Sequence, residues 1–160
     1  MPFAKLYGRV IIMNEQGKAE GGRAGCGSLN IMFDLYLDES SNDAAFSAER
    51  FDSILRASIE ASGMTLRKAF IDAWASEHSG PASLFYSLEE SHVRIETWPE
   101  EGHVQGEVQL CNFSKNNEQA ARQLSDRIVT TLNPAVSATV VIRRGPGPSM
   151  NVLESIVRRR

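Results

Sequence analysis

Hydrophobic and polar residues follow regular patterns over most of the chain, and these patterns predict its elements. Between residues 29 and 37, apolar side chains alternate with smaller or polar ones, at Leu29, Ile31, Phe33, Leu35 and Leu37. This is the period of a half-buried strand. Further runs predict strands at 65–74, 83–88, 92–98, 103–111 and 136–142. The segment 6–13 is a candidate edge strand.

Two segments have the spacing of amphipathic helices instead. Their apolar stripes are Phe51, Ile54, Leu55 and Ile59 in the first, and Ala121, Leu124, Ile128 and Leu132 in the second. Gly63 is placed to cap the first helix, and Asn133-Pro134 ends the second. Two helices are too few to cover both faces of the sheet. The predicted fold is therefore α+β, a two-layer α/β sandwich with an antiparallel sheet and two helices on one face.

The ends of the chain are less patterned than its middle. We expect residues 1–28, with a Gly-rich stretch at 17–27, to form a flexible N-terminal segment. Residues 29–143 are the predicted α+β domain. Residues 144–160 contain Gly145-Pro-Gly-Pro148 and end in three arginines, and we expect a C-terminal tail with one short helix. The 160 residues thus fit one domain with extensions.

Composition and charge narrow the classes of function. A chain with 42% hydrophobic and 23% charged residues is ordinary for a globular protein. Its net charge of −3 argues against a dedicated nucleic-acid binder. No apolar run is long enough for a membrane span, and residues 1–17 lack the pattern of a signal peptide. The two cysteines, Cys26 and Cys111, make no disulfide framework, so we expect a cytoplasmic protein.

A hairpin with residues 99–102 as its loop sets the register of two strands. The register pairs Ser91 with Leu110, so Cys111 lies beside the peptide bond between residues 90 and 91. It also places Arg94 opposite Glu107 as a candidate ion pair.

One face of this hairpin is polar and titratable: His92, Arg94, Glu96, Trp98, His103, Gln105, Glu107, Gln109 and Cys111. Three interpretations are open. The face is a solvated side of the sheet, a metal site around His92, His103, Glu96 and Glu107, or a catalytic face. No spacing matches a zinc signature.

The stretch from Glu90 to His103, continuing to Cys111, resembles the bacterial and archaeal S-adenosylmethionine decarboxylases. These are small, self-cleaving pyruvoyl enzymes. The shared features are Glu-Ser-His at 90–92, Thr-Trp-Pro-Glu at 97–100, and a cysteine twenty residues after the serine. The resemblance covers about residues 27–143 and is most specific at 83–111.

The resemblance implies a pyruvoyl-dependent decarboxylase (a carboxy-lyase) of polyamine and spermidine biosynthesis. The proenzyme would be cut by autocatalytic serinolysis between Glu90 and Ser91. Ser91 would become a covalent pyruvoyl group, the cofactor, which forms a Schiff base with the α-amine of the substrate. The conjugated system then holds the electrons left when carbon dioxide departs. S-adenosylmethionine is the family's default substrate.

The resemblance also implies roles for individual residues. Cys111 matches the acid that returns a proton to the decarboxylated carbon, although a cysteine is also a common small buried hydrophobe. Ser83 matches a serine that assists processing, and its alternative role is that of an ordinary strand serine. The substrate-binding candidates are Glu90, Trp98 and Glu100, of which Glu100 matches the glutamate on the ribose hydroxyls. No metal is implied.

Two positions depart from the family pattern. Glu96 stands where the family has a histidine that acts in processing, so Glu96 is a catalytic candidate in its place. Glu77 stands near the position of an aromatic ring that stacks on adenine. An acidic pocket suits a cationic side chain, which makes L-ornithine or L-arginine an alternative substrate. A second alternative is an uncleaved, non-catalytic regulatory homologue.

Distance along the strand predicts the quaternary structure. Glu96 is five residues from Ser91, about 16 Å in a strand, which is too far for both to reach one carbon. The resemblance implies a homodimer with composite active sites. Ser91 and Cys111 would come from one subunit, and Ser83, Glu96 and Glu100 from the other. We expect a small-molecule substrate and no nucleic-acid or membrane partner.

Overall fold

The described part of the chain folds into one antiparallel sheet with two helices. The computed structural model describes residues 27–38, 43–74, 80–89, 91–112, 115–145 and 149–160. The predicted edge strand at 6–13 and the Gly-rich stretch up to residue 26 lie outside these ranges. The strands are β1 (Ser28–Tyr36), β2 (Leu66–Ala73), β3 (Ala82–Leu88), β4 (Ser91–Trp98), β5 (His103–Cys111), β6 (Val136–Arg144) and β7 (Met150–Arg159).

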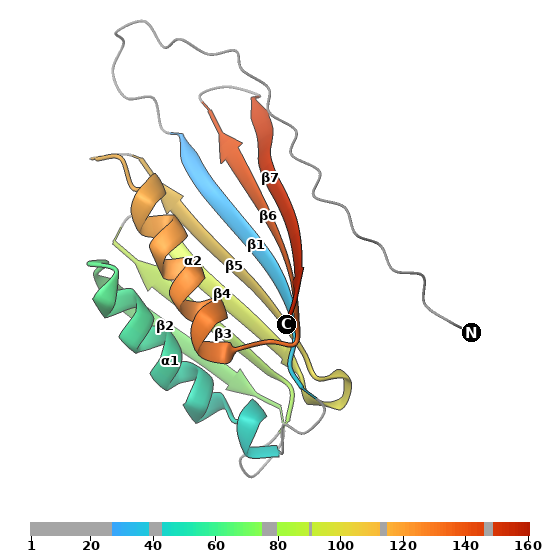
Figure 1. Cartoon of the computed structure of the whole chain (residues 1–160). Helices are drawn as coiled ribbons and strands as arrows, with labels where there is room; N and C mark the ends of the chain where they lie inside the picture. The colour runs from blue at the N-terminus through green and yellow to red at the C-terminus, as the bar shows by residue number, and fades with distance from the viewer. Residues whose placement is uncertain (1–26, 39–42, 75–79, 90, 113–114, 146–148) are drawn as a thin grey trace, which may run out of the picture.

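The sheet has the order β2-β3-β4-β5-β1-β6-β7, and every neighbouring pair is antiparallel. The helices α1 (Ala48–Ala61) and α2 (Glu118–Leu132) lie on the same face of it (Figure 1). Helix α1 packs on β2 and β3, and α2 packs on β1 and β5. This confirms the predicted α+β sandwich.

The core lies between the helices and the sheet, and alternation along the strands builds it. Leu29, Ile31, Phe33 and Leu35 of β1 are each at most 2% exposed. Both predicted apolar helix stripes face them, with Phe51, Leu55 and Ile59 from α1 and Ala121, Leu124, Ile128 and Leu132 from α2 buried. Burial of this apolar surface is the main favourable term in folding.

The helix ends follow the chemistry of the sequence. Ser47 caps α1 by accepting a hydrogen bond from the backbone N–H of Arg50 at 3.2 Å. Gly63 follows the helix with φ +68°, a conformation that glycine adopts without steric cost. Asn133 ends α2 in the left-handed conformation with φ 48°. Both predicted ends are confirmed.

The β4–β5 hairpin has the predicted register, with Ser91 opposite Leu110 and Arg94 opposite Glu107. A short 3₁₀ turn, η2 (Pro99–Glu101), and Gly102 with φ 61° connect the strands. The backbone N–H of Leu37 donates to the Gly102 carbonyl at 2.8 Å, which holds the turn against the end of β1.

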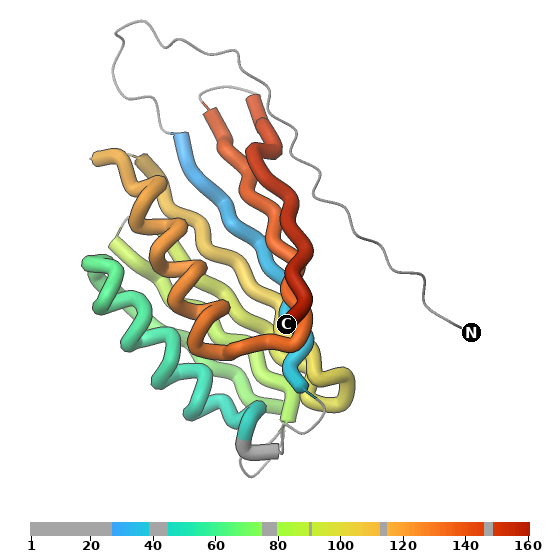
Figure 2. The backbone as a smooth tube through the Cα atoms, viewed as in Figure 1, coloured from blue at the N-terminus to red at the C-terminus, as the bar shows by residue number. Residues whose placement is uncertain are grey.

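The prediction of a short helix in the C-terminal tail is wrong. Residues 150–159 form the strand β7, which lies along β6 at one edge of the sheet (Figure 2). The pairing of β6 and β7 shifts register between Val141 and Ile142, where Leu153 is the extra residue. Strand β7 is held by backbone hydrogen bonds to β6, its one neighbour in the sheet. An edge strand of this kind can form without a strong apolar alternation in its own sequence.

Candidate functional site

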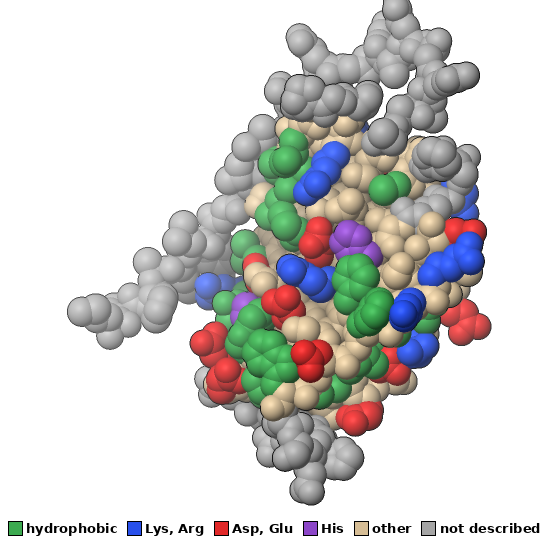
Figure 3. Space-filling model, turned by 180° about the vertical axis from the view of Figure 1, so that it is seen from behind, with side chains coloured by type: hydrophobic (Ala, Val, Ile, Leu, Met, Phe, Trp, Pro, Cys, Tyr) green, Lys and Arg blue, Asp and Glu red, His purple; other side chains and the backbone are tan. Residues whose placement is uncertain are grey.

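The sheet face opposite the helices carries most of the candidate residues, and we call it the open face. Figure 3 views the molecule from this side, where hydrophobic, charged and histidine side chains lie intermixed. Strands β4 and β5 supply the polar side chains predicted for it. Large hydrophobic side chains on this face are well exposed: Met32 39%, Tyr36 45%, Phe70 51% and Phe85 36%.

Ser91 and Cys111 lie at the same end of the hairpin. Ser91 is the first residue of β4, half-buried, with its Cα opposite that of Leu110. Cys111 is the last residue of β5 and a free, half-buried thiol, with its Cα opposite that of Ser28. Glu90, on the other side of the predicted cleavage point, lies outside the described residues.

The backbone after Cys111 is held in place by several hydrogen bonds. The Asn117 side chain donates from Nδ2 to the Cys111 carbonyl at 2.7 Å. The next backbone N–H, that of Asn112, donates to the Gly27 carbonyl at 2.8 Å. The Asn112 side chain in turn accepts from the N–H of Asn117 at 2.8 Å. These contacts fix the position of Cys111 at the edge of the open face, and the sequence analysis did not identify them.

The predicted ion pair between Arg94 and Glu107 is wrong, although the two residues are opposite each other as predicted. Arg94 instead lies 3.4 Å from Glu96, measured from Nη1 to Oε1. Glu107 accepts a hydrogen bond from Asn30 Nδ2 at 2.6 Å. Asn30 comes from β1 on the other side of β5, and it is 1% exposed. A buried amide thus binds the carboxylate in place of an exposed arginine.

Ser83 and Glu96 are brought together by the pairing of β3 with β4. Their Cα atoms are partners in the register, and both side chains are half-buried on the open face. Glu96 is also the partner of Gln105 in β5. Both residues remain separated from Ser91 by most of the length of β4, about 16 Å at 3.3 Å per residue.

Aromatic rings hold the two histidines at separate places on the open face. His103 is stacked between Tyr36 and Trp98, with ring centroids 4.8 Å and 5.2 Å away. Its Nε2 lies 3.0 Å from Asp34 Oδ1. His92 stacks on Phe85 with centroids 5.3 Å apart.

Within the described ranges, no three His, Cys, Asp or Glu side chains are grouped to hold a metal ion. Of the predicted substrate-binding residues, Trp98 is half-buried in this stack and Glu100 is exposed in η2. Glu77 and Glu90 lie outside the described residues. The sequence analysis did not identify the contacts that Asp34 and Tyr36 make with His103. Strand alternation over residues 29–37 could have indicated them, because it puts both side chains on the face of the strand that the buried leucines do not occupy.

The clearest pKa shifts are found away from the open face. Burial on the helix side, helped by a hydrogen bond of 2.7 Å to Asp52 Oδ1, raises the pKa of Tyr86. The hydrogen bonds to Glu118 raise the pKa of Arg143 near the start of α2. Each of these contacts joins a strand to a helix, Tyr86 of β3 to α1 and Arg143 of β6 to α2.

Comparison with known proteins places this arrangement in a family. The family described as S-adenosylmethionine decarboxylase matches residues 30–145. The chain belongs to the S-adenosylmethionine decarboxylase family. The match includes Ser83, Ser91, Glu96 and Cys111, and it ends before β7.

A solved structure supports the fold of this S-adenosylmethionine decarboxylase family member. The crystal structure of the adenosylmethionine decarboxylase from Aquifex aeolicus VF5 superposes with a TM-score of 0.63 at 24% identity. The match covers 79% of this chain and 95% of that one. No curated protein matches the chain. Among the described helices, none has the length and apolar character needed to cross a membrane.

Proposed function

We propose that this member of the S-adenosylmethionine decarboxylase family is a proenzyme that cleaves its own backbone between Glu90 and Ser91 to become a pyruvoyl-dependent decarboxylase. The observation that carries the proposal is the register at the Ser91 end of the hairpin. Ser91 is paired with Leu110, and Cys111 is the residue that follows Leu110 in β5. The serine to be converted and the thiol that would act as the acid thus lie at the same end of the hairpin, Ser91 on the face of Val93 and Ile95 and Cys111 on the open face.

The chemistry of cleavage uses a serine already beside its target. The Ser91 hydroxyl oxygen bonds to the carbonyl carbon of residue 90, and the amide C–N bond breaks as its nitrogen gains a proton. Elimination across the Cα–Cβ bond of residue 91 releases the upstream chain as a carboxylate. Tautomerisation and hydrolysis then expel ammonia and leave a keto group. Intramolecular placement removes the entropic cost of bringing the reactants together.

The residues at this edge fit a pyruvoyl group, which would supply an electrophilic carbonyl that accepts the electrons left when carbon dioxide departs. Cys111 would return a proton to the carbon that loses the carboxylate. Its thiol is free and half-buried, and its backbone carbonyl is anchored by Asn117, which supports this role. Ser83 and Glu96, which are opposite each other, would act in processing of a neighbouring subunit.

A homodimer with composite sites follows from the separation of Ser91 and Glu96 along one strand. The exposed hydrophobic side chains of the open face support contact with a second copy, because four large ones lie there among charged groups. Each site would combine Ser91 and Cys111 of one subunit with Ser83, Glu96 and Glu100 of the other.

Subunit complementation tests the composite site. Cys111→Ser and Glu100→Gln should each inactivate the enzyme. A statistical mixture of the two, co-expressed, should recover about one quarter of the sites, because each heterodimer keeps one intact site. Ser91→Ala co-expressed with Cys111→Ser is the matched control, since both changes affect groups of the same subunit. Recovery of decarboxylase activity in the control pair would contradict the composite arrangement. Absence of activity in the test pair would contradict it as well.

Denaturing mass spectrometry tests the self-cleavage. Purified protein should give fragments 1–90 and 91–160, the second lighter than a serine-ended fragment by the mass of ammonia. Ser91→Ala should remain one chain. Reductive trapping with cyanoborohydride and an amine substrate should label only the second fragment. An intact chain that takes up no label would refute the proposal and favour a non-catalytic regulatory homologue.

Substrate choice is tested by release of labelled carbon dioxide from S-adenosylmethionine, L-ornithine and L-arginine in parallel. We propose S-adenosylmethionine as the substrate on the strength of the family. The acidic Glu77, where the family has an aromatic ring, makes the two cationic amino acids the informative competitors. Release from either one alone would overturn the choice of substrate while leaving the reaction class intact.

A further inference from the structure

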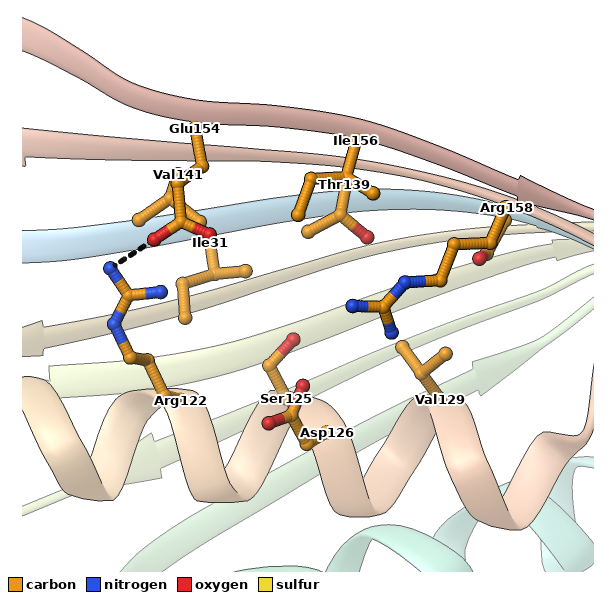
Figure 4. A pocket seen from close by; sticks show the side chains of 11 residues that line it. Ile31, Arg122, Ser125, Asp126, Val129, Thr139, Val141, Glu154, Ile156 and Arg158 are labelled. Atoms are coloured by element: carbon orange, nitrogen blue, oxygen red, sulfur yellow. Dashed lines mark ion pairs between the residues drawn. The ribbon is translucent and has the colours of Figure 1, made fainter. Parts of the chain in front are cut away.

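A cavity lies on the helix side of the sheet, where α2 leaves β6 and β7 uncovered. Its volume is about 150 Å³. One wall is α2 and the other is formed by β6 and β7, as Figure 4 shows. Strand β7 lies beyond residues 30–145, which the family matches. The cavity faces away from the candidate active site.

The strand wall is built from side chains that are direct partners in the β6–β7 register. The pairs are Val141 with Glu154, Thr139 with Ile156 and Ser137 with Arg158. On α2, the cavity is lined at helical spacing by Arg122, Ser125, Asp126 and Val129. Apolar side chains form the floor, with Ile31 2% and Val141 3% exposed.

One end of the cavity is closed by an ion pair and the other end carries an unpaired cation. Arg122 of α2 binds Glu154 of β7 at 2.7 Å. Arg158 extends from β7 toward Val129 (Figure 4), and within the described residues it forms no ion pair. A guanidinium with this freedom is suited to binding a carboxylate through two parallel hydrogen bonds.

Hydroxyl groups between these ends provide further donors. Ser125 and Ser137 are 3% and 7% exposed, and Thr139 is half-buried. In the part of the chain that the structure describes, none of the three hydroxyls makes a hydrogen bond. The three hydroxyls open into the cavity, so they are available to donate to a ligand that supplies acceptors.

We propose that this cavity binds a small aliphatic monocarboxylate. The carboxylate would accept hydrogen bonds from Arg158 and the hydroxyl of Ser125, and the aliphatic part would lie on Ile31, Val129 and Ile156. The net charge of the cavity lining is zero, because it contains two arginines and two carboxylates. One of these carboxylates, Asp126, is exposed. This balance favours a single negative charge over a polyanion. A cavity of this size accommodates about six non-hydrogen atoms.

The test is a titration of the full-length protein, with labelled Ile and Val methyl groups followed by NMR. Butyrate is the probe, with butylammonium and inorganic phosphate titrated in parallel at constant ionic strength. Butyrate should shift the methyl signals of Ile31, Val129 and Ile156 along saturable curves in the millimolar range. The cation should leave them in place, and phosphate should bind at least ten-fold more weakly.

Arg158→Gln should weaken butyrate binding at least ten-fold, and Ser125→Ala should weaken it by a smaller factor. The matched control is Arg159→Gln, because Arg159 is the adjacent exposed arginine whose side chain alternates to the other face of the strand. Unchanged methyl signals elsewhere would verify that each variant is folded. Ser91→Ala should bind butyrate as well as the parent, which separates this site from the proposed self-cleavage.

Three results would overturn the proposal. The first is no saturable shift at these methyl groups at tens of millimolar butyrate. The second is equal loss of binding in Arg158→Gln and Arg159→Gln, which would indicate non-specific attraction. The third is binding of phosphate or butylammonium as tight as that of butyrate, which would contradict the assigned class of ligand.

Discussion

Gly106 in the middle of β5 is a position where one added methyl group should measurably destabilise the protein. A Cβ at residue 106 would come within 3.0 Å of three atoms of the Phe33 ring: Cδ2, Cε2 and Cζ. Carbon atoms in contact prefer about 3.5–4.0 Å. Phe33 is the cross-strand partner of Gly106 and is 1% exposed, so its ring is enclosed by the core. The ring or the strand must therefore move in Gly106→Ala.

The expected cost follows from measured effects of overpacking. Extra methyl groups in packed cores cost about 1–3 kcal/mol. Replacing glycine within a strand returns about 0.5–1 kcal/mol of backbone entropy. Because three ring atoms are displaced at once, we expect a net loss of about 2 kcal/mol. For a chain of this length, that corresponds to a fall in Tm of about 4–8 °C.

Thermal unfolding followed by circular dichroism measures this loss. All variants should carry Ser91→Ala, so that one intact chain unfolds, and should be compared at one protein concentration. In a Phe33→Leu background, where the ring is absent, Gly106→Ala should cost less than it does in the parent, and the difference gives the coupling between the two residues. A Gly106→Ala protein within about 0.5 kcal/mol of the parent would refute the contact between Phe33 and residue 106.

Three further predictions concern charge and catalysis. The pKa of Tyr86 is higher in the folded protein than in the unfolded chain, where it is about 10. The contribution of Tyr86 to the free energy of unfolding is therefore complete below pH 10, and it falls by about 1.4 kcal/mol for each pH unit above that. Urea titrations of Tyr86→Phe should show a flatter decline above that pH, and an unchanged decline would contradict the shift. Cys111→Ser should lower decarboxylation about 10²–10⁴-fold while mass spectrometry still finds fragments 1–90 and 91–160; full activity would exclude Cys111 as the acid. Glu96→His should speed cleavage and Glu96→Gln should slow it in time courses of fresh protein, whereas equal rates would remove Glu96 from processing.

Much of this fold could be predicted from the sequence because local chemistry determines it. Alternation along 29–37 selects the buried face of β1, and the helical spacing of Phe51, Leu55 and Ile59 selects the packed side of α1. The turn at 99–102 sets the register of two strands, because a one-residue slip would turn every side chain to the wrong face. The juxtaposition of Ser91 with Leu110, and hence with Cys111, followed from that turn.

Other features depended on neighbours that are distant in the chain. Residues 150–159 are a strand because β6 offers them a row of backbone donors and acceptors, and no local pattern required it. Glu107 binds Asn30 because β1 lies on one side of β5 while β4 lies on the other. The β4–β5 hairpin considered alone shows β4 as a neighbour of β5 and omits β1. The cavity beside α2 likewise exists because α2 crosses β1 and β5 and leaves β6 and β7 uncovered, which the tertiary packing alone decided.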